Sequence, residues 1–231
     1  MAQENSSNNA NNSLTSNITI DPGSVLGDAF VQFNLGSTAG FTVGVDDSDS
    51  DSFVVASGSA LGTNNAMRIA STGEVNFPKQ PSFQAYLSST QISVTGNGTA
   101  YTVPCNSEIF DLNGDYNTST YTFTAPVTGR YVFTYHISLR TDSSSGGDYW
   151  VSSVVTSNRE YFCVTMPTTN RVTGSFYYGS SFVYLGFSGT CFADMDASDT
   201  AYLRIKSSGG SKLDDVAGGS QRTYFMGYLA C

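Results

Sequence analysis

The amino-acid sequence predicts an all-β protein, on three observations. The 231 residues include 23 Gly, 14 Tyr and 15 Phe, with Ser, Thr and Asn throughout, a composition that favours strands and tight turns. No long stretch shows apolar residues at helical spacing. Between residues 130 and 139, by contrast, apolar side chains occupy every second position and so share one face of a strand: Tyr131, Phe133, Tyr135, Ile137 and Leu139.

Residues 1–17 form a polar segment, MAQENSSNNANNSLTSN, with almost no side chain to bury. This composition predicts a flexible tail that becomes ordered only on a partner, so we expect it to anchor the chain on a larger particle. The segment has neither the charged n-region nor the apolar h-region of a secretory signal peptide. No run of 18 apolar residues occurs in the chain, so we expect no membrane insertion.

Residues 18–80 predict a β-rich stalk or base. Glycines separate short apolar runs, which we expect as strands at Ala29–Leu35, Phe41–Val45, Ser52–Ala56, Ala66–Ala70 and Glu74–Phe77. Each strand is too short and too weakly apolar to make a core of its own. We therefore expect this segment to gain stability by packing against copies of itself, as in a trimeric stalk.

Residues 81–231 predict a jelly-roll head, because Pro78 and Pro81 mark a boundary and many short strands follow. The expected strands are residues 81–89, Gln91–Val94, Tyr121–Thr124, Arg130–Leu139, Tyr149–Thr156, Glu160–Met166, Gly174–Tyr178, Ser181–Phe187, Thr200–Lys206 and Thr223–Leu229. Two long polar connections, Arg140–Tyr149 and Ser207–Gln221, are the kind of loop in which binding residues usually lie.

The order of aromatic residues in this part resembles the globular head of complement C1q, a jelly-roll domain related to tumour necrosis factor. The residues that carry the resemblance are Asp111, Tyr116, Gly129, Tyr131, Phe133 and Tyr135, followed in the closing strand by Phe225, Gly227, Tyr228 and Leu229. Cys105 is a departure, because the family has a phenylalanine at that place. The resemblance implies a homotrimer whose core and threefold interface are built from Tyr131, Phe133, Tyr135, Phe225, Gly227 and Leu229.

A second resemblance concerns residues 29–75. Their pattern of small turns and short apolar runs is similar to a segment that recurs in tail-fibre and other appendage proteins of bacterial viruses. In those proteins the segment precedes a C-terminal head or chaperone domain. It implies a virion protein that is assembled in the host cytoplasm.

The charge of the chain argues against nucleic acid as a partner. The formal net charge is −9, and residues 1–67 contain no Lys or Arg. No basic patch is therefore available for a phosphate backbone.

Two acidic segments are candidate metal sites, with calcium as the possible ion and no other cofactor expected. The first is the alternating series Asp111, Asn113 and Asp115, and the second is Asp47, Asp49 and Asp51, which three copies of the chain could bring together. A solvated polar turn is the favoured interpretation of both segments, because neither has the full ligand pattern of a known calcium loop.

Catalytic candidates are weak, so the sequence predicts no enzyme. The only histidine, His136, has no nucleophile motif beside it, and no pair of carboxylates stands out.

Trp150, Tyr177 and Tyr178 could form a surface on which a receptor sugar stacks, or they could belong to the core or the subunit interface. Cys163 and Cys191 could form a disulfide if their strands are adjacent, or each could be a free buried thiol.

Together these features predict a trimeric fibre or spike of a bacterial virus, whose N-terminal region joins other virion proteins and whose head contacts a glycan or protein on the host surface. The alternative is a secreted or surface-displayed bacterial adhesion module, which would be extracellular. An enzyme that acts on surface glycans is a third hypothesis.

Overall fold

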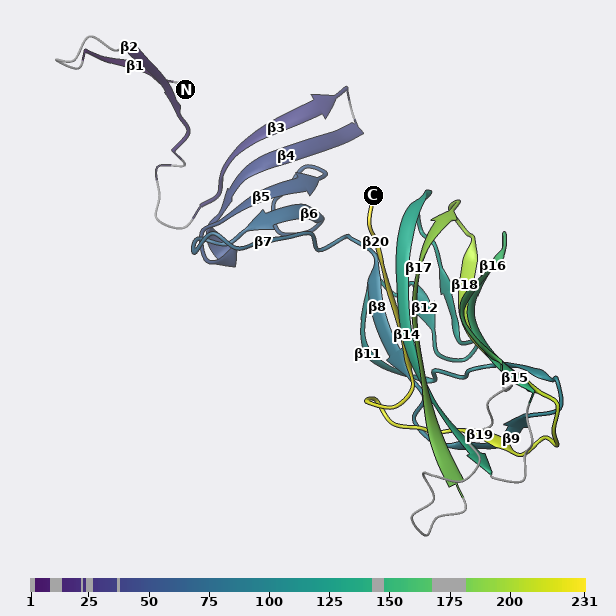
Figure 1. Cartoon of the computed structure of the whole chain (residues 1–231). Coiled ribbons are helices and arrows are strands. Elements are labelled where there is room, and N and C mark those ends of the chain that lie inside the picture. Colours follow the sequence, from purple (N-terminus) through teal and green to yellow (C-terminus); the bar gives the residue numbers. More distant parts are fainter. Residues whose placement is uncertain are drawn as a thin grey trace. The chain divides into compact units, whose positions relative to one another are not determined.

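The computed structural model describes residues 3–8, 14–21, 23, 27–36, 38–142, 148–167 and 182–231. The chain forms two compact units, residues 1–80 and residues 81–231 (Figure 1). Among the described residues, no helix is long and apolar enough to cross a membrane.

The N-terminal unit begins with a pair of antiparallel strands, β1 (Gln3–Asn8) and β2 (Leu14–Thr19). The sequence predicts no strand before residue 18, so these two strands are a difference from that expectation. The two segments are rich in Asn, Ser and Thr and lack an apolar alternation, which is the usual sequence signal for a strand.

The rest of this unit is a five-stranded antiparallel meander. Its strands follow one another in the sheet in chain order: β3 (Ala29–Leu35), β4 (Thr38–Asp46), β5 (Ser52–Ser57), β6 (Asn65–Ile69) and β7 (Val75–Asn76). A short 3₁₀ turn, η1 (Asp47–Asp49), joins β4 to β5. The strands lie close to where the sequence predicts them, except that β4 begins at Thr38 and includes Gly40, which the sequence predicts as a separator before Phe41.

One face of the meander is apolar and open. The strand register brings together Val31, Val43, Val55 and Met67 in one row, and Ala29, Val45, Phe53, Ile69 and Val75 in the next. Phe33 and Phe41 pair beside them and are 60% and 54% exposed. On the opposite face Val54, Ala56 and Leu61 form a small buried apolar cluster, and the polar residues Thr42, Asp46 and Ser52 are buried as well.

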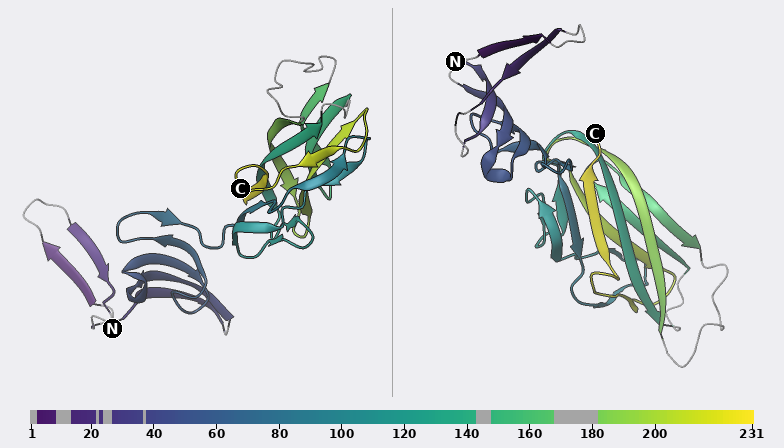
Figure 2. Two further views of the ribbon diagram at one scale, coloured as in Figure 1. Left: turned by 90° about the horizontal axis from the view of Figure 1, so that it is seen from below. Right: turned by 90° about the vertical axis from the view of Figure 1, so that its left-hand side faces the viewer.

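The head contains two sheets that form separate layers (Figure 2). The first, named here the β15 sheet, has the strand order β12 (Tyr116–Asn117), β13 (Thr122–Thr124), β18 (Thr200–Ser208), β15 (Tyr149–Thr156) and β16 (Glu160–Pro167), with β10 (Ala100–Thr102) paired to β18.

The second, the β14 sheet, has the order β11 (Ser107–Leu112), β8 (Ser82–Tyr86), β20 (Tyr224–Leu229), β14 (Gly129–Asp142), β19 (Asp214–Val216) and β9 (Gln91–Thr95), and β17 (Phe182–Met195) pairs with β14. Several neighbours, such as β13 and β18 or β20 and β14, are distant in the sequence, which is typical of a jelly roll. The predicted all-β fold class is therefore confirmed.

The differences in strand content have local causes. β17 runs to Met195, well beyond the predicted end at Phe187, because it pairs along the whole length of β14. β10, β11, β12 and β19 were not predicted, since they are short, or polar, or both. The expected strand Gly174–Tyr178 lies outside the described residues.

The core between the sheets is aromatic. Tyr131, Phe133 and Tyr135 are fully buried, and the Phe133 ring stacks on Phe225 at 5.5 Å between centroids. Gly227 makes this packing possible, because a Cβ atom there would lie 2.5 Å from the Phe133 ring.

A hydrogen bond also ties the two layers together. The Tyr135 hydroxyl of the β14 sheet lies 2.6 Å from the Ser152 hydroxyl of the β15 sheet. Both groups are buried, so the bond satisfies two polar atoms that water cannot reach.

Candidate functional site

The candidate functional site of the head is the side of the β14 sheet that faces away from the core, named here the outward face. Three rows of side chains cross the sheet on this face. Each row takes one residue from β17, β14, β20, β8 and β11, in that order. The rows are Phe192, Val132, Tyr228, Ser82 and Leu112; Thr190, Thr134, Met226, Gln84 and Phe110; and Ser188, His136, Tyr224, Tyr86 and Ser107. None of these side chains is an acid, a lysine or an arginine.

The apolar residues of the outward face are exposed. Phe192, Tyr228 and Phe110 are 54%, 50% and 48% exposed, respectively. Phe110, Val132, Met226 and Tyr228 line a shallow hollow of about 120 Å³. An uncharged, partly aromatic surface of this kind is typical of the centre of a protein interface, where charged residues are depleted.

Charged side chains flank the outward face at both ends of β14. Arg130 lies 4.0 Å from Asp194 at one end, and Arg140 binds Asp215 at the other, with 2.7 Å between Arg140 Nε and Asp215 Oδ2. The uncharged rows therefore occupy the middle of the sheet.

The residues that form the core and those that can form the threefold interface are different, although the resemblance implies one set for both. Tyr131, Phe133, Tyr135 and Phe225 are 0% exposed within a single chain, and Gly227 is also buried. Leu229 is partly buried and packs against the same core. Because successive residues of a strand face opposite sides, the alternating residues Val132, Thr134, Met226 and Tyr228 are the ones that a partner can reach.

The Asp111–Asp115 loop is organised by its own hydrogen bonds. The Asp111 carboxylate accepts the backbone N–H groups of Asp115 at 3.1 Å and Tyr116 at 2.9 Å. Asn113 and Gly114 between them have left-handed backbones, with φ of 81° and 76°. Both Asp111 oxygens are thus occupied by the turn.

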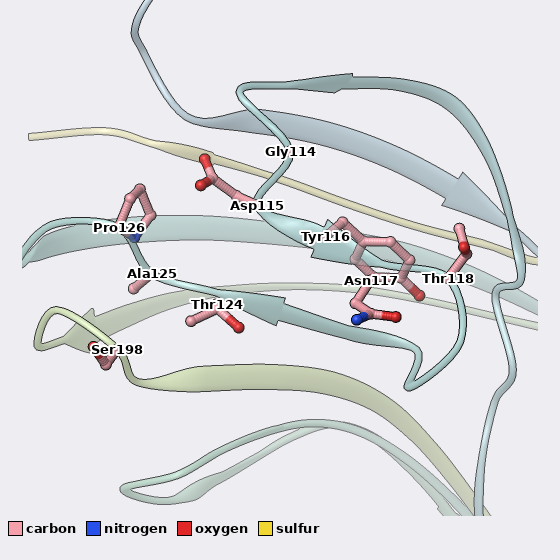
Figure 3. A pocket seen from close by; sticks show the side chains of 9 residues that line it. All are labelled: Gly114, Asp115, Tyr116, Asn117, Thr118, Thr124, Ala125, Pro126 and Ser198. Carbon is pink, nitrogen blue, oxygen red and sulfur yellow. The ribbon is translucent and has the colours of Figure 1, made fainter.

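Asp115 borders a pocket of about 530 Å³ (Figure 3). The pocket is lined by Gly114, Asp115, Tyr116, Asn117, Thr118, Thr124, Ala125, Pro126 and Ser198. One oxygen of Asp115, Oδ2, is buried and has no hydrogen-bond partner. Burial, and to a lesser extent repulsion by Asp111, raises the pKa of the Asp115 carboxyl.

The acids of the meander are partly neutralised. Asp49, in η1, accepts bonds from Arg68 Nε at 2.5 Å and Nη2 at 2.9 Å, and this pairing lowers the pKa of the Asp49 carboxyl. The Asp47 backbone N–H donates to Asp28 Oδ1 at 3.1 Å, and Asp51 has a left-handed backbone with φ of 57°. The pairing joins η1 to β6, and nothing in the spacing of these residues along the sequence indicates it.

No group of three or more acids, histidines or cysteines that could hold a metal ion occurs among the described residues. Calcium usually takes six to eight oxygen ligands. Neither acidic segment supplies such a set within one chain, and calcium binding between copies stays a prediction.

The receptor candidates divide into one described residue and two that lie outside the described ranges, Tyr177 and Tyr178. Trp150 packs against the core, and its Nε1–H group donates to Asp214 Oδ2 at 3.4 Å. Asp214 is buried and also accepts the Thr141 hydroxyl at 2.6 Å. Trp150 is thus part of a buried polar network that includes β19, within the segment that the sequence predicts as a polar loop.

A groove on the β15 sheet, on the side away from the core, was not predicted. It has a volume of about 280 Å³ and is lined by Tyr149, Val151, Ser153, Glu160, Phe162, Arg204 and Lys206. Phe162 is 65% exposed, and the Lys206 ammonium lies 5.8 Å from the centre of the Tyr149 ring. These residues come from β15, β16 and β18, so no single stretch of sequence shows the groove.

The two-layer sandwich and its uncharged outward face define a jelly-roll module that is suited to association. The chain belongs to the C1q domain family, whose model matches residues 83–230. The expected relationship to the complement head is therefore confirmed.

Solved structures similar to this chain include the globular domain of the zebrafish complement 1qA protein, with 17% identity, a TM-score of 0.42, and coverage of 66% of this chain and 98% of that one. A crystal structure of murine APRIL at pH 8.5 has 9% identity and a TM-score of 0.43, covering 65% of this chain and 99% of its own. A comparison with curated proteins found no match.

Proposed function

We propose that this protein is a homotrimeric attachment protein, a fibre or spike of a bacterial virus whose C1q-type head contacts the host surface. The outward face is the observation that supports a trimer, because three uncharged rows with exposed aromatic rings cross the sheet there. In a chain of net charge −9, a neutral surface allows copies to approach without mutual repulsion.

The meander supports the same assembly. Its apolar face would leave Phe33, Phe41 and Phe53 in water in an isolated chain, at 60%, 54% and 41% exposure. Contiguous exposed apolar surface of this kind marks an interaction site. Packing between copies would bury it and make residues 18–80 the stalk that the sequence predicts.

The head presents the groove of the β15 sheet on the side of the sandwich opposite to the outward face. Exposed Phe162, together with Tyr149 and Lys206, offers rings for stacking and a cation for polar groups of a glycan or protein. Three such heads on one stalk would bind by avidity, so each contact can be weak. This arrangement requires neither nucleic acid nor membrane insertion.

The proposal assigns no catalytic step to the head. His136 Nδ1 lies 2.7 Å from the Ser188 hydroxyl, and the ring stacks on Tyr224. Among the described residues no carboxylate hydrogen-bonds to this histidine, whereas a serine–histidine pair in hydrolases is oriented by such a group.

Assembly of particles with variant chains would test the proposal. Deletion of residues 1–17 should leave a folded trimer that no longer joins the particle, because that segment is the expected anchor. Phe162→Ser, in the groove, should leave incorporation unchanged and reduce adsorption to host cells. Ile92→Ser is the matched control, because Ile92 is 69% exposed and lies on β9, in the other sheet.

Three outcomes would count against parts of the proposal. Normal incorporation of the truncated chain would place the anchor in residues 18–80. If the Phe162→Ser and Ile92→Ser particles adsorbed equally well, the head would be interpreted as a domain that holds the trimer together and does not bind the host. Immunogold labelling that finds the chain on bacterial surfaces and never on particles would favour the secreted or surface-displayed adhesion module.

A further inference from the structure

Cys163 and Cys191 meet at an edge of the sandwich where the two sheets face each other. Cys163 belongs to β16, which pairs only with β15 among the described strands, and Cys191 belongs to β17, which pairs only with β14. Backbone hydrogen bonds within the described residues therefore do not join these two strands. Among the described residues, side chains make the contact between the sheets at this edge.

The approach of the two strands is close. Gly189 and Cys191 lie on the same face of β17, and this face meets Cys163 of β16. Two residues before Cys191, a Cβ atom added to Gly189 would lie 2.4 Å from the Cys163 Cβ and 2.7 Å from the Tyr135 hydroxyl oxygen. Glycine at position 189 thus lets β16 approach β17 closely beside the two cysteines.

The two thiols differ in accessibility and acidity. Cys163 is partly exposed, whereas Cys191 is buried in the core. Interaction with the Cys191 thiol lowers the pKa of the Cys163 thiol, and the same interaction raises the pKa of Cys191. A partly exposed thiolate is the form of cysteine that attacks disulfides, so Cys163 has the properties of the attacking group and Cys191 those of the resolving one.

We propose that Cys163 and Cys191 are a disulfide-forming pair that covalently clasps the two sheets of the head when the protein meets a small-molecule disulfide such as oxidised glutathione. In the first step the Cys163 thiolate attacks one sulfur of glutathione disulfide and releases a glutathione thiolate, which takes up a proton. In the second, Cys191 loses its proton and attacks the Cys163 sulfur of the mixed disulfide, and the second glutathione leaves. Two protein thiols are oxidised and one glutathione disulfide is reduced to two thiols.

This proposal does not depend on the function proposed above. A protein folded in a reducing compartment would contain two thiols at this edge, and transfer to an oxidising one would close residues 163–191 into a covalent loop. The clasp would restrict separation of β16 from β17, where no backbone pairing does so. Closing a loop of this length should raise the melting temperature of the head by about 5 to 10 °C.

Peptide mapping of the full chain without reduction tests the proposal. The reduced protein is equilibrated in glutathione buffers of rising oxidised fraction, free thiols are blocked with N-ethylmaleimide, and the cross-linked peptides are identified by mass. We expect a Cys163–Cys191 cross-link, a higher melting temperature, and reversal of both by dithiothreitol. Cys231→Ser is the matched control and should retain both effects, because Cys231 is an exposed thiol distant from the pair in sequence.

Cys163→Ala and Cys191→Ala should each abolish the cross-link and the gain in melting temperature. Two results on the unaltered protein, which do not depend on the folding of any variant, would overturn the proposal. One is that both thiols still react with N-ethylmaleimide after equilibration in the most oxidising buffer. The other is that Cys163 is recovered only as its mixed disulfide with glutathione.

Discussion

Phe133 and His136 lie three residues apart in β14 and face opposite sides of the sheet. Phe133 is 0% exposed and packs on Phe225 and Phe83, whereas His136 lies on the outward face beside Ser188. Phe133→Ala should therefore lower the free energy of unfolding by about 3–5 kcal/mol, because it removes a ring and leaves a cavity. His136→Ala should cost far less. Denaturant unfolding of both variants checks this, and the reverse ranking would mean that the strand register is displaced by one residue.

Asp115 gives a testable dependence of stability on pH at the residue scale. Its folded-state pKa is raised by burial, so its charge disfavours the folded state once the pH rises above the unfolded-state pKa. Asp115→Asn should thus raise the melting temperature near pH 7, and the gain should vanish near about pH 3, where the wild-type carboxyl is also protonated. Scanning calorimetry at the two pH values measures this difference. An equal gain at both would show that the charge of Asp115 is not the cause.

The same variant tests the calcium prediction for this loop. If Asp115 contributed to a calcium site, calcium should raise the melting temperature of the wild-type protein and have no such effect on Asp115→Asn. An equal response of the two proteins, or none, would contradict calcium binding at this residue.

At the scale of elements, an added charge should have different effects on trimer assembly in the two sheets. Phe192→Asp places a carboxylate on the outward face, so three copies would bring three negative charges into a buried interface. The variant should remain folded and become monomeric. Phe162→Asp is the matched control, since Phe162 is an exposed phenylalanine on β16 of the other sheet, and it should stay trimeric. Light scattering and circular dichroism measure mass and folding, and dissociation of both variants would argue against the outward face as the interface.

The elements that the sequence predicted well share a physical cause. β3, β5 and β14 have apolar alternation bounded by glycine or polar turns, and the structure places them within a residue or a few of their expected limits. β19 could not be predicted, because its residues Asp214 and Asp215 are acids that are buried through pairing with Thr141 and Arg140, far away in the sequence. Local propensity gives no sign of such pairing.

The outward face, like the strands, could be predicted from the sequence only in part. The aromatic row of β14 predicts a buried face, and the alternate positions follow from the same period of two. Which strands lie beside β14 depends on long-range pairing, so the rows that join Phe192, Val132 and Tyr228 appear only in the folded chain. The groove around Phe162 and the contact between Cys163 and Cys191 are unpredictable for the same reason.

At the scale of the whole molecule, the two units differ in how much core they contain. The head has an aromatic core that extends from Phe83 to Phe225, whereas the buried cluster of the meander consists of Val54, Ala56 and Leu61. Residues 81–231 expressed alone should therefore fold and unfold cooperatively. Residues 1–80 alone should remain unfolded or associate through their apolar face. Thermal melts by circular dichroism check both expectations, and a head that lacks a cooperative transition would contradict the first.

The central claim is that the chain assembles as a homotrimer through faces that one chain leaves uncovered. The most direct measurement is the mass of the full-length protein in solution, by light scattering coupled to size exclusion at a concentration of about 10 μM. The account predicts a mass three times the 24.6 kDa of one chain. A mass of 24.6 kDa at that concentration would contradict it.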